Sequence, residues 1–372
     1  MRFGIVLSVP WMPGSDPSQC FAEGLEEAEL AEDLGFDSVW VTEHHFSLHG
    51  LCSGITPFLA ALAMRTRRLR IGAAVFVLPL WNPVRLAEDV AVLDHLSGGR
   101  IEFGVGTGYR LDEFRGFNVS PDLSREMGRE ALETILRLWT ADGPVTWEGK
   151  YYRVNDVAVH PPPRQQPHPP VWFAANSAPT IAYVAEHGFH WMAASTFGTL
   201  DQLVARRRLL DQALRQAGRD PDAIRVYTHI PTYVAAAADY EAIRQELEPG
   251  VRWFRRAARW FAVGSRHLGG TIYDTGAAGP EEDFDFRAFY EGNAFIGDAE
   301  TCYRKIEAFC RRFRPTDLVF AFRLGQPHER TMRAMARFAR EVLPHLRTLG
   351  PFPAAAADGE AEELGPVEGP GP

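Results

Sequence analysis

The sequence lacks the cysteine pattern of a disulfide-stabilised or zinc-binding protein. Its 372 residues include four cysteines, which are scattered and form no CxxC pair. No HExxH motif is present either. The spacing therefore favours reduced thiols over a disulfide framework or a structural zinc site. The four cysteines are Cys20, Cys52, Cys302 and Cys310.

Long hydrophobic runs and basic stripes are missing as well. No uninterrupted apolar run reaches about 18 residues, the length that a transmembrane helix needs. Residues 1–7 carry one basic side chain and a short apolar run, which predicts a first strand and no signal peptide. The absence of a basic stripe argues against nucleic acid as a partner. We therefore expect a cytoplasmic protein that binds neither nucleic acid nor a membrane.

The composition provides enough apolar material for a large core. Hydrophobic residues make up 46% of the chain and aromatic residues 12%, which excludes disorder for most of its length. The formal net charge is -9, and five of the acidic residues lie in the last fifteen positions. Past Gly350 the chain is rich in proline, alanine, glycine and glutamate. We therefore expect one domain over residues 1–350 and a disordered tail over residues 351–372.

Strand and helix patterns alternate along the expected domain. Eight apolar runs alternate with segments of helical spacing, mostly over short distances. This rhythm predicts an α/β fold, a (β/α)8 barrel, more strongly than an open doubly wound sheet. It breaks after the seventh strand, where residues 240–295 form an insertion. Its segment 264–286 is an equal candidate for a mobile lid or a passive loop. The expected strands are 3–9, 38–42, 69–80, 100–105, 171–174, 191–194, 225–234 and 318–322, and the last expected helix is 329–346.

Two adjacent histidines end the second expected strand, in the sequence Thr42-Glu43-His44-His45-Phe46. Strand ends carry the chemistry of α/β barrels, and imidazole has the ordinary pKa nearest to neutral pH. Metal binding, proton transfer and packing are all compatible with this pattern. Side chains alternate along a strand, so His44 and His45 should point apart, which disfavours a shared metal ion. Proton transfer and packing stay open, and no metal is expected.

Two further motifs lie at strand ends. Residues 176–180, Asn-Ser-Ala-Pro-Thr, open a helix with capping residues and a first-turn proline, which suits a bound anion as well as ordinary capping. Arg125, at the start of the helix after the fourth strand, could add a cation on the same side. Residues 104–108, Gly-Val-Gly-Thr-Gly, let a flat group or another backbone approach closely. They do not match the GxGxxG nucleotide fingerprint.

Together these stretches resemble the flavin-dependent bacterial luciferase-like monooxygenases, and the catalytic (α) subunit of luciferase in particular. The resemblance covers most of residues 1–350. Because many pieces match in order, it is far more specific than any single motif. The matching stretches are residues 35–37, 43–46, 77–79, 82–85, 87–90, 93–94, 100–104 and 176–180.

The resemblance implies a barrel that binds reduced FMN (FMNH2) at its C-terminal mouth. A separate flavin reductase would supply the FMNH2, which would react with O2 to a C4a-hydroperoxide and oxygenate an organic substrate. The reaction would be a hydroxylation, an epoxidation or a Baeyer–Villiger oxidation, and the subunits would form a homodimer. The alanine- and arginine-rich composition adds aromatic polyketides as a candidate substrate class. An F420-dependent dehydrogenase and a non-catalytic flavin-binding partner subunit stay open as alternatives, with a metal-dependent barrel hydrolase below them.

Carried over by position, His44 would be the catalytic acid or base, with a pKa near neutrality, beside the flavin. His45 would support it at the edge of the substrate pocket. The Ala74–Val75 peptide lies where the family has a non-prolyl cis peptide against the flavin ring. The implied flavin-binding residues are Ala74, Val75, Gly106, Thr107, Arg125, Asn176, Ser177 and Thr180, and the implied pocket residues are His45, Phe46 and Trp253.

The sequence departs from luciferase at three of these positions. Gly106 stands in place of a reactive cysteine, Thr107 in place of an arginine, and Asn176 in place of a glutamate. Light emission from a fatty aldehyde is therefore not expected. Gly106 would instead leave room beside the flavin for a bulkier, polycyclic substrate.

Overall fold

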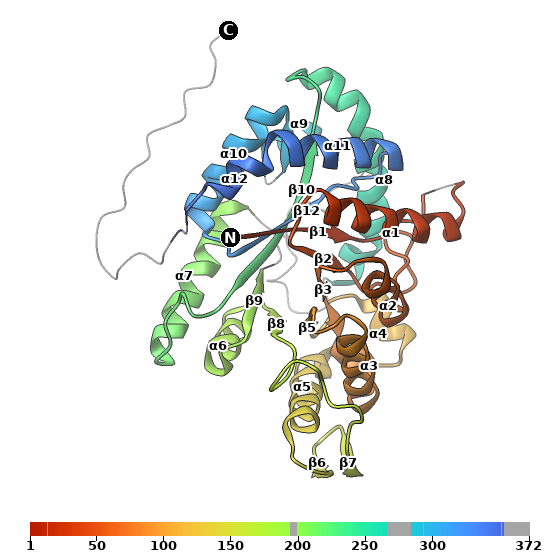
Figure 1. Ribbon diagram of the computed structural model, residues 1–372, viewed down its shortest axis with the longest axis vertical. Coiled ribbons are helices and arrows are strands. Elements are labelled where there is room, and N and C mark those ends of the chain that lie inside the picture. The colour runs from red at the N-terminus through yellow and green to blue at the C-terminus, as the bar shows by residue number, and fades with distance from the viewer. Residues whose placement is uncertain (13, 194–198, 266–283, 293, 351, 353–372) are drawn as a thin grey trace.

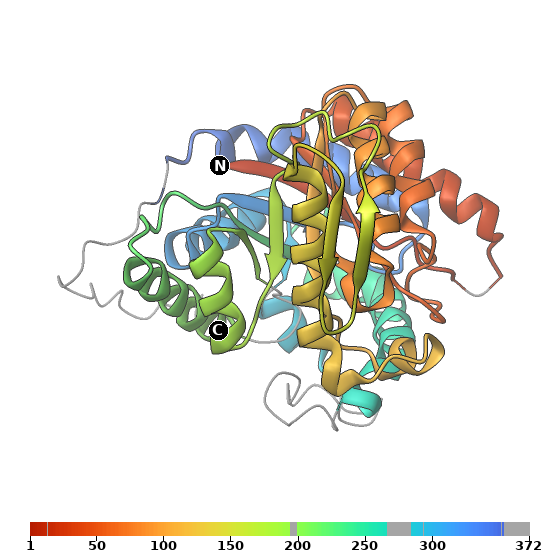
Figure 2. The same ribbon diagram turned by 90° about the horizontal axis from the view of Figure 1, so that it is seen from below.

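Eight parallel strands close into a barrel with helices around it, which confirms the expected fold (Figures 1 and 2). The computed structural model describes residues 1–12, 14–193, 199–265, 284–292, 294–350 and 352. Each strand of the barrel pairs with two others, and the last one returns to the first. Around the barrel the order is β1 (Arg2–Leu7), β2 (Ser38–Val41), β3 (Arg70–Ala73), β5 (Ile101–Gly106), β8 (Val171–Ala174), β9 (His190–Ala193), β10 (Val226–Val234) and β12 (Asp317–Ala321).

Capping side chains and prolines mark the ends of several helices that connect these strands. Helix α3, for example, starts where the Asn82 side chain accepts hydrogen bonds from the N–H groups of Val84 and Arg85. The last expected helix divides in two because Pro344 starts a new one. The connecting helices are α1 (Pro17–Asp33), α2 (Ile55–Arg65), α3 (Pro83–Leu96), α5 (Ser124–Thr140), α6 (Ala178–His187), α7 (Leu200–Gln216), α10 (Ala299–Phe313), α11 (His328–Glu341) and α12 (Leu343–Arg347).

The single strand expected over residues 69–80 is wrong. The chain leaves β3 after Ala73, passes through a cis peptide between Ala74 and Val75, and pairs again only briefly with β5 as β4 (Phe76–Val77). A short 3-10 turn follows at Leu78–Leu80. The strand is interrupted because the N–H of Val77 donates to the Glu43 carboxylate, and because Pro79 has no N–H to donate.

Several short elements were not expected from the sequence. Helix α4 (Leu111–Gly116) follows β5 on the side of the barrel mouth, and it packs against α8 (Tyr240–Ser265). The proline-rich connection before β8 is preceded by an antiparallel hairpin beside α5 (Figure 1). Elements this short leave weak periodic patterns in the sequence. The others are η2 (Pro121–Leu123), β6 (Val145–Glu148), β7 (Arg153–Val157), α9 (Phe286–Glu291) and β11 (Phe295–Gly297).

Large aromatic side chains fill the interior of the barrel. The rings of Trp40 and Trp172 meet edge to face at 5.4 Å, and Trp40 and Tyr227 lie 4.8 Å apart. Trp40 fits because its neighbour on β3 is Gly72, where a Cβ would lie 2.2 Å from the Trp40 ring. The interior is therefore a packed core, and the space for ligands is confined to the ends of the barrel.

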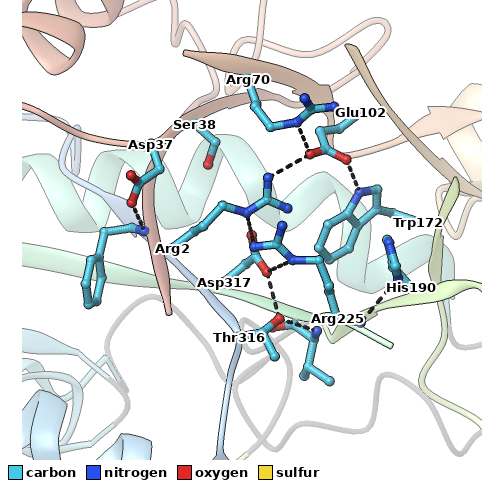
Figure 3. A network of polar contacts seen from close by, with 12 residues as sticks. Arg2, Asp37, Ser38, Arg70, Glu102, Trp172, His190, Arg225, Thr316 and Asp317 are labelled. Atoms are coloured by element: carbon cyan, nitrogen blue, oxygen red, sulfur yellow. Dashed lines mark hydrogen bonds and ion pairs between the residues drawn. The ribbon is translucent and has the colours of Figure 1, made fainter. Parts of the chain in front are cut away.

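An ion-pair network with buried carboxylates and partly exposed arginines lies at the N-terminal end of the barrel (Figure 3). Arg2 lies between two carboxylates, 3.0 Å from Glu102 and 2.9 Å from Asp317. Arg225 binds Asp317 at 2.7 Å, and the Trp172 indole donates to Glu102 at 2.7 Å. Paired and hydrogen-bonded charges of this kind are compatible with burial. This end of the barrel is filled, so the candidate site lies at the opposite, C-terminal end.

Two expectations fall largely outside the described residues. The candidate lid, residues 264–286, includes residues 266–283, and the expected tail, residues 351–372, is described only at residue 352. Both stay predictions.

Candidate active site

The histidine pair lies in the loop after β2, at the C-terminal mouth of the barrel. Backbone hydrogen bonds fasten both ends of this loop. The N–H of Thr42 donates to Leu7 at 3.1 Å, and the N–H of Leu51 donates to Val9 at 3.0 Å. Because β1 and its following turn hold the loop, His44 and His45 have fixed positions at the mouth.

His44 is buried between α4 and its own loop. Its Nδ1 lies 3.4 Å from Oε1 of Glu113, in the first turn of α4. Its ring meets the ring of His49 at 4.3 Å, and a Cβ at Gly50 would lie 3.1 Å from His44 Cδ2. Phe254 of α8 covers His49 at 5.0 Å. The imidazole of His44 is therefore enclosed on several sides.

His45 has a different carboxylate partner from His44. Its Nε2 lies 2.9 Å from Oε1 of Glu43, which is itself fully buried. Glu43 also accepts hydrogen bonds from the Trp81 indole at 3.0 Å and from the N–H of Val77 at 3.2 Å. Glu43 thus ties the loop after β2 to the residues after β3, and His45 contacts this carboxylate. The supporting role expected for His45 stays a prediction.

The electrostatics of the mouth differ from the sequence-based expectation for His44. Burial, followed by the nearby charges of Arg110 and His45, lowers the pKa of His44 to about 3. Burial raises the pKa of Glu113 to about 7. The expectation of a near-neutral pKa for His44 is therefore wrong. At neutral pH His44 is an uncharged imidazole, and the group that titrates near neutrality is its partner Glu113.

Aromatic side chains form the outer rim beside the histidines. Phe46 is 61% exposed and Phe117 is 41% exposed, and their rings lie 5.6 Å apart. Phe117 also meets the ring of His45 edge to face at 4.7 Å. Phe46 packs this closely because α4 has Gly116 beneath it, where a Cβ would lie 2.1 Å from the Phe46 ring. Exposed aromatic rings at the opening of a buried site are suited to contact an apolar ligand.

Small, half-buried side chains line the opposite part of the mouth. Ala74, Val75, Ala174 and Ala321 pack on top of the aromatic barrel core without being covered themselves. Gly106, at the end of β5, lies between Val75 and Ala174. These short side chains form a surface at the strand ends, called the shelf below. A surface of short apolar side chains is suited to contact a flat ring system.

The space beside Gly106 is not open, contrary to expectation. A Cβ at this position would lie 2.8 Å from Cγ2 of Val75 and 3.4 Å from Cβ of Ala174. The Val75 side chain therefore takes up the room that a longer residue at position 106 would need. Any added room for a bulky substrate must come from elsewhere in the mouth.

Gly106→Ala is expected to destabilise the protein by about 1–3 kcal/mol, the usual cost of overpacking a core. Val75 is β-branched and rotates poorly, so it cannot easily make way. In a Val75→Ala background the clashing methyl group is gone, and the cost of Gly106→Ala should fall to near zero. Urea unfolding of the two single variants, the double variant and the parent measures this coupling.

Gly143→Ala is the matched control, because a Cβ there would meet nothing within 4 Å. It should change the unfolding free energy by no more than about 0.5 kcal/mol. An equal cost of Gly106→Ala with and without Val75 would show that Val75 does not fill this space.

The helix start after β8 carries the features of an anion site. The hydroxyl groups of Ser177 and Thr180 are in hydrogen-bond contact with each other at the N-terminus of α6. Oδ1 of Asn176 is buried without a hydrogen-bond partner. Hydroxyl donors and the positive end of a helix dipole suit a phosphate group, and Asn176 could contribute only through its amide NH2, because its Oδ1 is an acceptor. The three residues expected at this site are therefore adjacent in the structure.

An arginine reaches this helix start, but it is not the one expected. Arg129 of α5 donates to the carbonyl oxygen of Pro179 at 3.4 Å, and its guanidinium lies 4.5 Å from the centre of the Tyr183 ring. Its Nε is buried without a hydrogen-bond partner. Arg125 is exposed one turn earlier on the same helix. Arg129 was missed because a helical arginine in mid-sequence gives no signal of what it faces.

Thr107 and Trp253 lie at the mouth with less distinct roles. A Cβ at Gly128 of α5 would lie 2.9 Å from Cγ2 of Thr107, so the methyl group of Thr107 packs against that helix. Trp253 is half-buried on α8, while its neighbour Phe254 contacts the histidine cluster. Their roles toward flavin and substrate stay predictions.

Neither a metal site nor a membrane-spanning helix is found among the described residues. Within the part of the chain that the structure describes, no three His, Cys, Asp or Glu side chains are arranged to hold a metal ion. No helix among the same residues is long and apolar enough to cross a membrane.

Comparison with known proteins assigns the family. Residues 1–314 match the sequence profile of the luciferase-like monooxygenases. The chain belongs to this family. The resemblance first drawn from short stretches is thereby confirmed over most of the chain.

Curated relatives of this luciferase-like monooxygenase include proteins with assigned reactions. It is 31% identical over 270 residues to the 4-hydroxyprotoasukamycin monooxygenase of Streptomyces nodosus subsp. asukaensis, covering 71% of each chain. An alkanal monooxygenase alpha chain from Photorhabdus luminescens is 29% identical over 246 residues, or 66% of each chain. An uncharacterised protein of Sinorhizobium fredii is 37% identical over 175 residues, which cover 47% of this chain. The match spans about half of that relative's length, 51%.

Solved structures show that the same fold serves more than one cofactor. Monooxygenase RslO1 from Streptomyces bottropensis superposes with a TM-score of 0.80 at 29% identity, covering 93% of this chain and 100% of that one. A type II Baeyer–Villiger monooxygenase from Pseudomonas putida, in complex with FMN, gives 0.77 at 21% identity, covering 94% and 99%. An F420-dependent secondary alcohol dehydrogenase gives 0.71 at 20% identity, covering 92% and 98%. The last two likenesses show the fold alone.

Proposed function

We propose that this luciferase-like monooxygenase uses FMNH2 and O2 to oxygenate an organic substrate. The observation that carries the proposal is the combination of three features at one mouth. These are the anion site at the start of α6, the shelf of small side chains, and the enclosed His44–Glu113 pair. A phosphate-bearing flat cofactor needs the first two, and proton transfer beside it needs the third.

The residues present fit FMN. Ser177, Thr180 and Asn176, with Arg129 and the nearby Arg125, would hold the phosphate at the start of α6. The flavin ring would lie against the shelf, beside the small side chains of Ala74, Val75 and Gly106. Thr107, the next residue after Gly106, would lie at the edge of the ring. Reduced flavin, when bound, supplies the two electrons with which O2 is activated. We propose that a separate flavin reductase delivers the reduced flavin. We also propose a cytoplasmic location for the protein.

The protein's own contribution is a dry site with a positioned proton carrier. His44 is buried at the mouth and uncharged at neutral pH, so it can accept or relay a proton there. The aromatic rim limits the access of water once a substrate is seated. Neither function requires a metal ligand or a covalent bond to the protein.

The rim favours an apolar, aromatic substrate. Phe46 and Phe117 are exposed at the opening, together with Leu48 at 49% exposure, and Trp253 lies on the neighbouring helix α8. Aromatic faces stack on flat ring systems and exclude water from them. We propose an aromatic polyketide-type molecule as substrate, with hydroxylation, epoxidation or Baeyer–Villiger oxidation as the reaction.

The test is anaerobic titration of the purified protein with FMNH2, followed by addition of ¹⁸O2 and a panel of aromatic polyketides. The proposal requires saturable FMNH2 binding and one ¹⁸O atom in the product. Binding of reduced F420 with substrate turnover in the absence of O2 would establish the dehydrogenase alternative instead. Flavin binding without turnover of any substrate would support a non-catalytic partner subunit.

We also propose that the enzyme is a homodimer. Three apolar side chains are exposed on the adjacent helices α2 and α3, namely Met64, Val92 and Leu96. Apolar surface shared between two helices is typical of a subunit contact. Sedimentation of the full chain measures its mass, and a monomer at micromolar concentration would contradict the proposal.

A further inference from the structure

The carboxylate of Glu113 lies at the centre of the contacts around His44. Its Oε1 accepts a hydrogen bond from the backbone N–H of His45 at 3.0 Å, and it lies 3.4 Å from Nδ1 of His44 and 3.3 Å from Nε of Arg110. Glu113 is only 3% exposed. A carboxyl group of this kind can hold an imidazole in one tautomer, because one ring nitrogen must serve it.

The packing leaves His44 little freedom to turn away from this carboxylate. The ring of His49 and the backbone at Gly50 flank the imidazole, and Glu113 stands at its Nδ1 edge. Nε2 lies on the opposite edge of the ring. When Nδ1 of His44 takes up a proton, Nε2 can therefore release one, and the reverse exchange is equally possible.

We propose that Glu113 is the positioning residue for His44. Glu113 orients the imidazole through Nδ1 and exchanges a proton with it, and His44 carries that proton to and from the mouth. The proposal rests on the monooxygenase function above and deepens it, because it assigns the proton source of that same site. It also explains why an uncharged histidine can serve there.

The proton balance is closed within the pair. When Nε2 of His44 gives a proton to a group in the mouth, Nδ1 takes the proton of the Glu113 carboxyl group. Glu113 is then a carboxylate, stabilised by Arg110 and by the N–H of His45. In the reverse direction Nε2 accepts a proton and Nδ1 returns one to Glu113. No oxidant or metal takes part in this exchange.

The surrounding charges support this assignment. Arg110 lies beside Glu113 and binds Asp112 at 3.0 Å, and His45, His49 and Glu43 are further ionisable groups near the pair among the described residues. Burial raises the pKa of Glu113 to about 7 and lowers that of His44 to about 3. Below about pH 7 the exchangeable proton is therefore on Glu113, and it is lost as the pH rises through that value.

The first test uses protein without flavin, so that it stands apart from the oxygenation assay. In ¹⁵N-imidazole-labelled protein, the His44 signals are assigned by their loss in His44→Ala. We expect His44 to stay uncharged across the neutral range and its Nδ1 to change from acceptor to donor near pH 7, as Glu113 ionises. In Glu113→Gln this change should be absent. Protonation of His44 itself near pH 6.5 in both proteins would overturn the proposal.

The second test is the pH profile of substrate turnover. Glu113→Gln keeps a hydrogen-bonding group at Nδ1 but cannot release a proton, whereas Glu113→Ala loses both functions. In the wild type we expect the turnover rate to change with pH near pH 7, where Glu113 ionises, and we call this change the limb of the profile. In Glu113→Gln the limb should be absent and turnover lowered by about 10- to 100-fold. Glu113→Asp, which restores an acid, should recover part of the loss together with the limb. A limb unchanged in Glu113→Gln would contradict proton exchange.

Two controls separate this role from a structural one. Glu32 is another buried glutamate that accepts backbone N–H bonds, from Arg67, Arg68 and Leu69, far from the mouth. Glu32→Gln should lower the melting temperature without moving the pH profile. The double variant His44→Ala/Glu113→Gln should be no slower than His44→Ala alone, because the two residues act as a unit. If FMNH2 and O2 give no turnover in the wild type, the NMR titration still decides the proposal about the pair.

Discussion

Replacement of His44 by alanine is expected to lower oxygenation of the substrate by about 100-fold or more, the usual contribution of a positioned proton-transfer group. The physical reason is specific to the enclosed imidazole. In the described structure it lies between Glu113, His49 and Gly50, and in the proposed mechanism it carries the proton between Glu113 and the mouth. Because an alanine leaves this space without a proton carrier, kcat should fall while FMN binding is retained.

The measurement combines O2-dependent product formation with an FMN titration of the same preparation. His345→Ala provides a matched control, since His345 is exposed on α12 at a distance from the mouth. It should leave turnover within about two-fold of wild type, as expected for a surface substitution. Turnover of His44→Ala at the wild-type rate would remove His44 from the proposed mechanism.

Gly104→Ala is expected to have the largest effect on stability, with a loss of more than about 4 kcal/mol or failure to fold. A Cβ at this position would lie 1.9 Å from the carbonyl oxygen of Ala73 and 3.1 Å from its carbonyl carbon. These are backbone atoms of β3, which neighbours β5 in the barrel. The clash can be relieved only if the two strands move apart, which would open the barrel.

Gly104 and Gly106 form a natural comparison, because they lie two residues apart on the same strand and face different neighbours. The order of destabilisation should be Gly104→Ala, then Gly106→Ala, then Gly143→Ala, as measured by urea unfolding or, for a variant that does not fold, by the yield of native protein. A Gly104→Ala variant as stable as Gly143→Ala would show that β3 and β5 are not in this close contact.

The glycine motif at residues 104–108 shows how far the sequence could be interpreted. Alternating glycines predicted the close approach of a flat group or of another backbone. The structure assigns the backbone approach to Gly104 and a side-chain approach to Gly106, where Val75 takes the space. The sequence could not distinguish them because both neighbours come from another part of the chain.

The histidine pair shows the same division. Its place near a strand end followed from the alternation of strands and helices. The argument from strand periodicity does not apply, because β2 ends at Val41 and both histidines lie in the loop that follows. The partner of His44 could not be predicted, because Glu113 lies 69 residues later, on a helix of six residues with no clear pattern. The pKa of His44 could not be predicted from the sequence either. Burial of the imidazole is its largest determinant, and this burial depends on how α4 packs against the loop after β2.

The sequence by itself determined the barrel, the strand ends that carry the histidines, and the helix start with Ser177 and Thr180. These features follow from local periodicity and capping, which act within a few residues of the chain. Only the tertiary structure decided that Glu113 pairs with His44, that Arg129 reaches α6, and that Val75 fills the space beside Gly106. The reason is physical: distances between strand-end loops and the desolvation of charges arise only when the barrel closes.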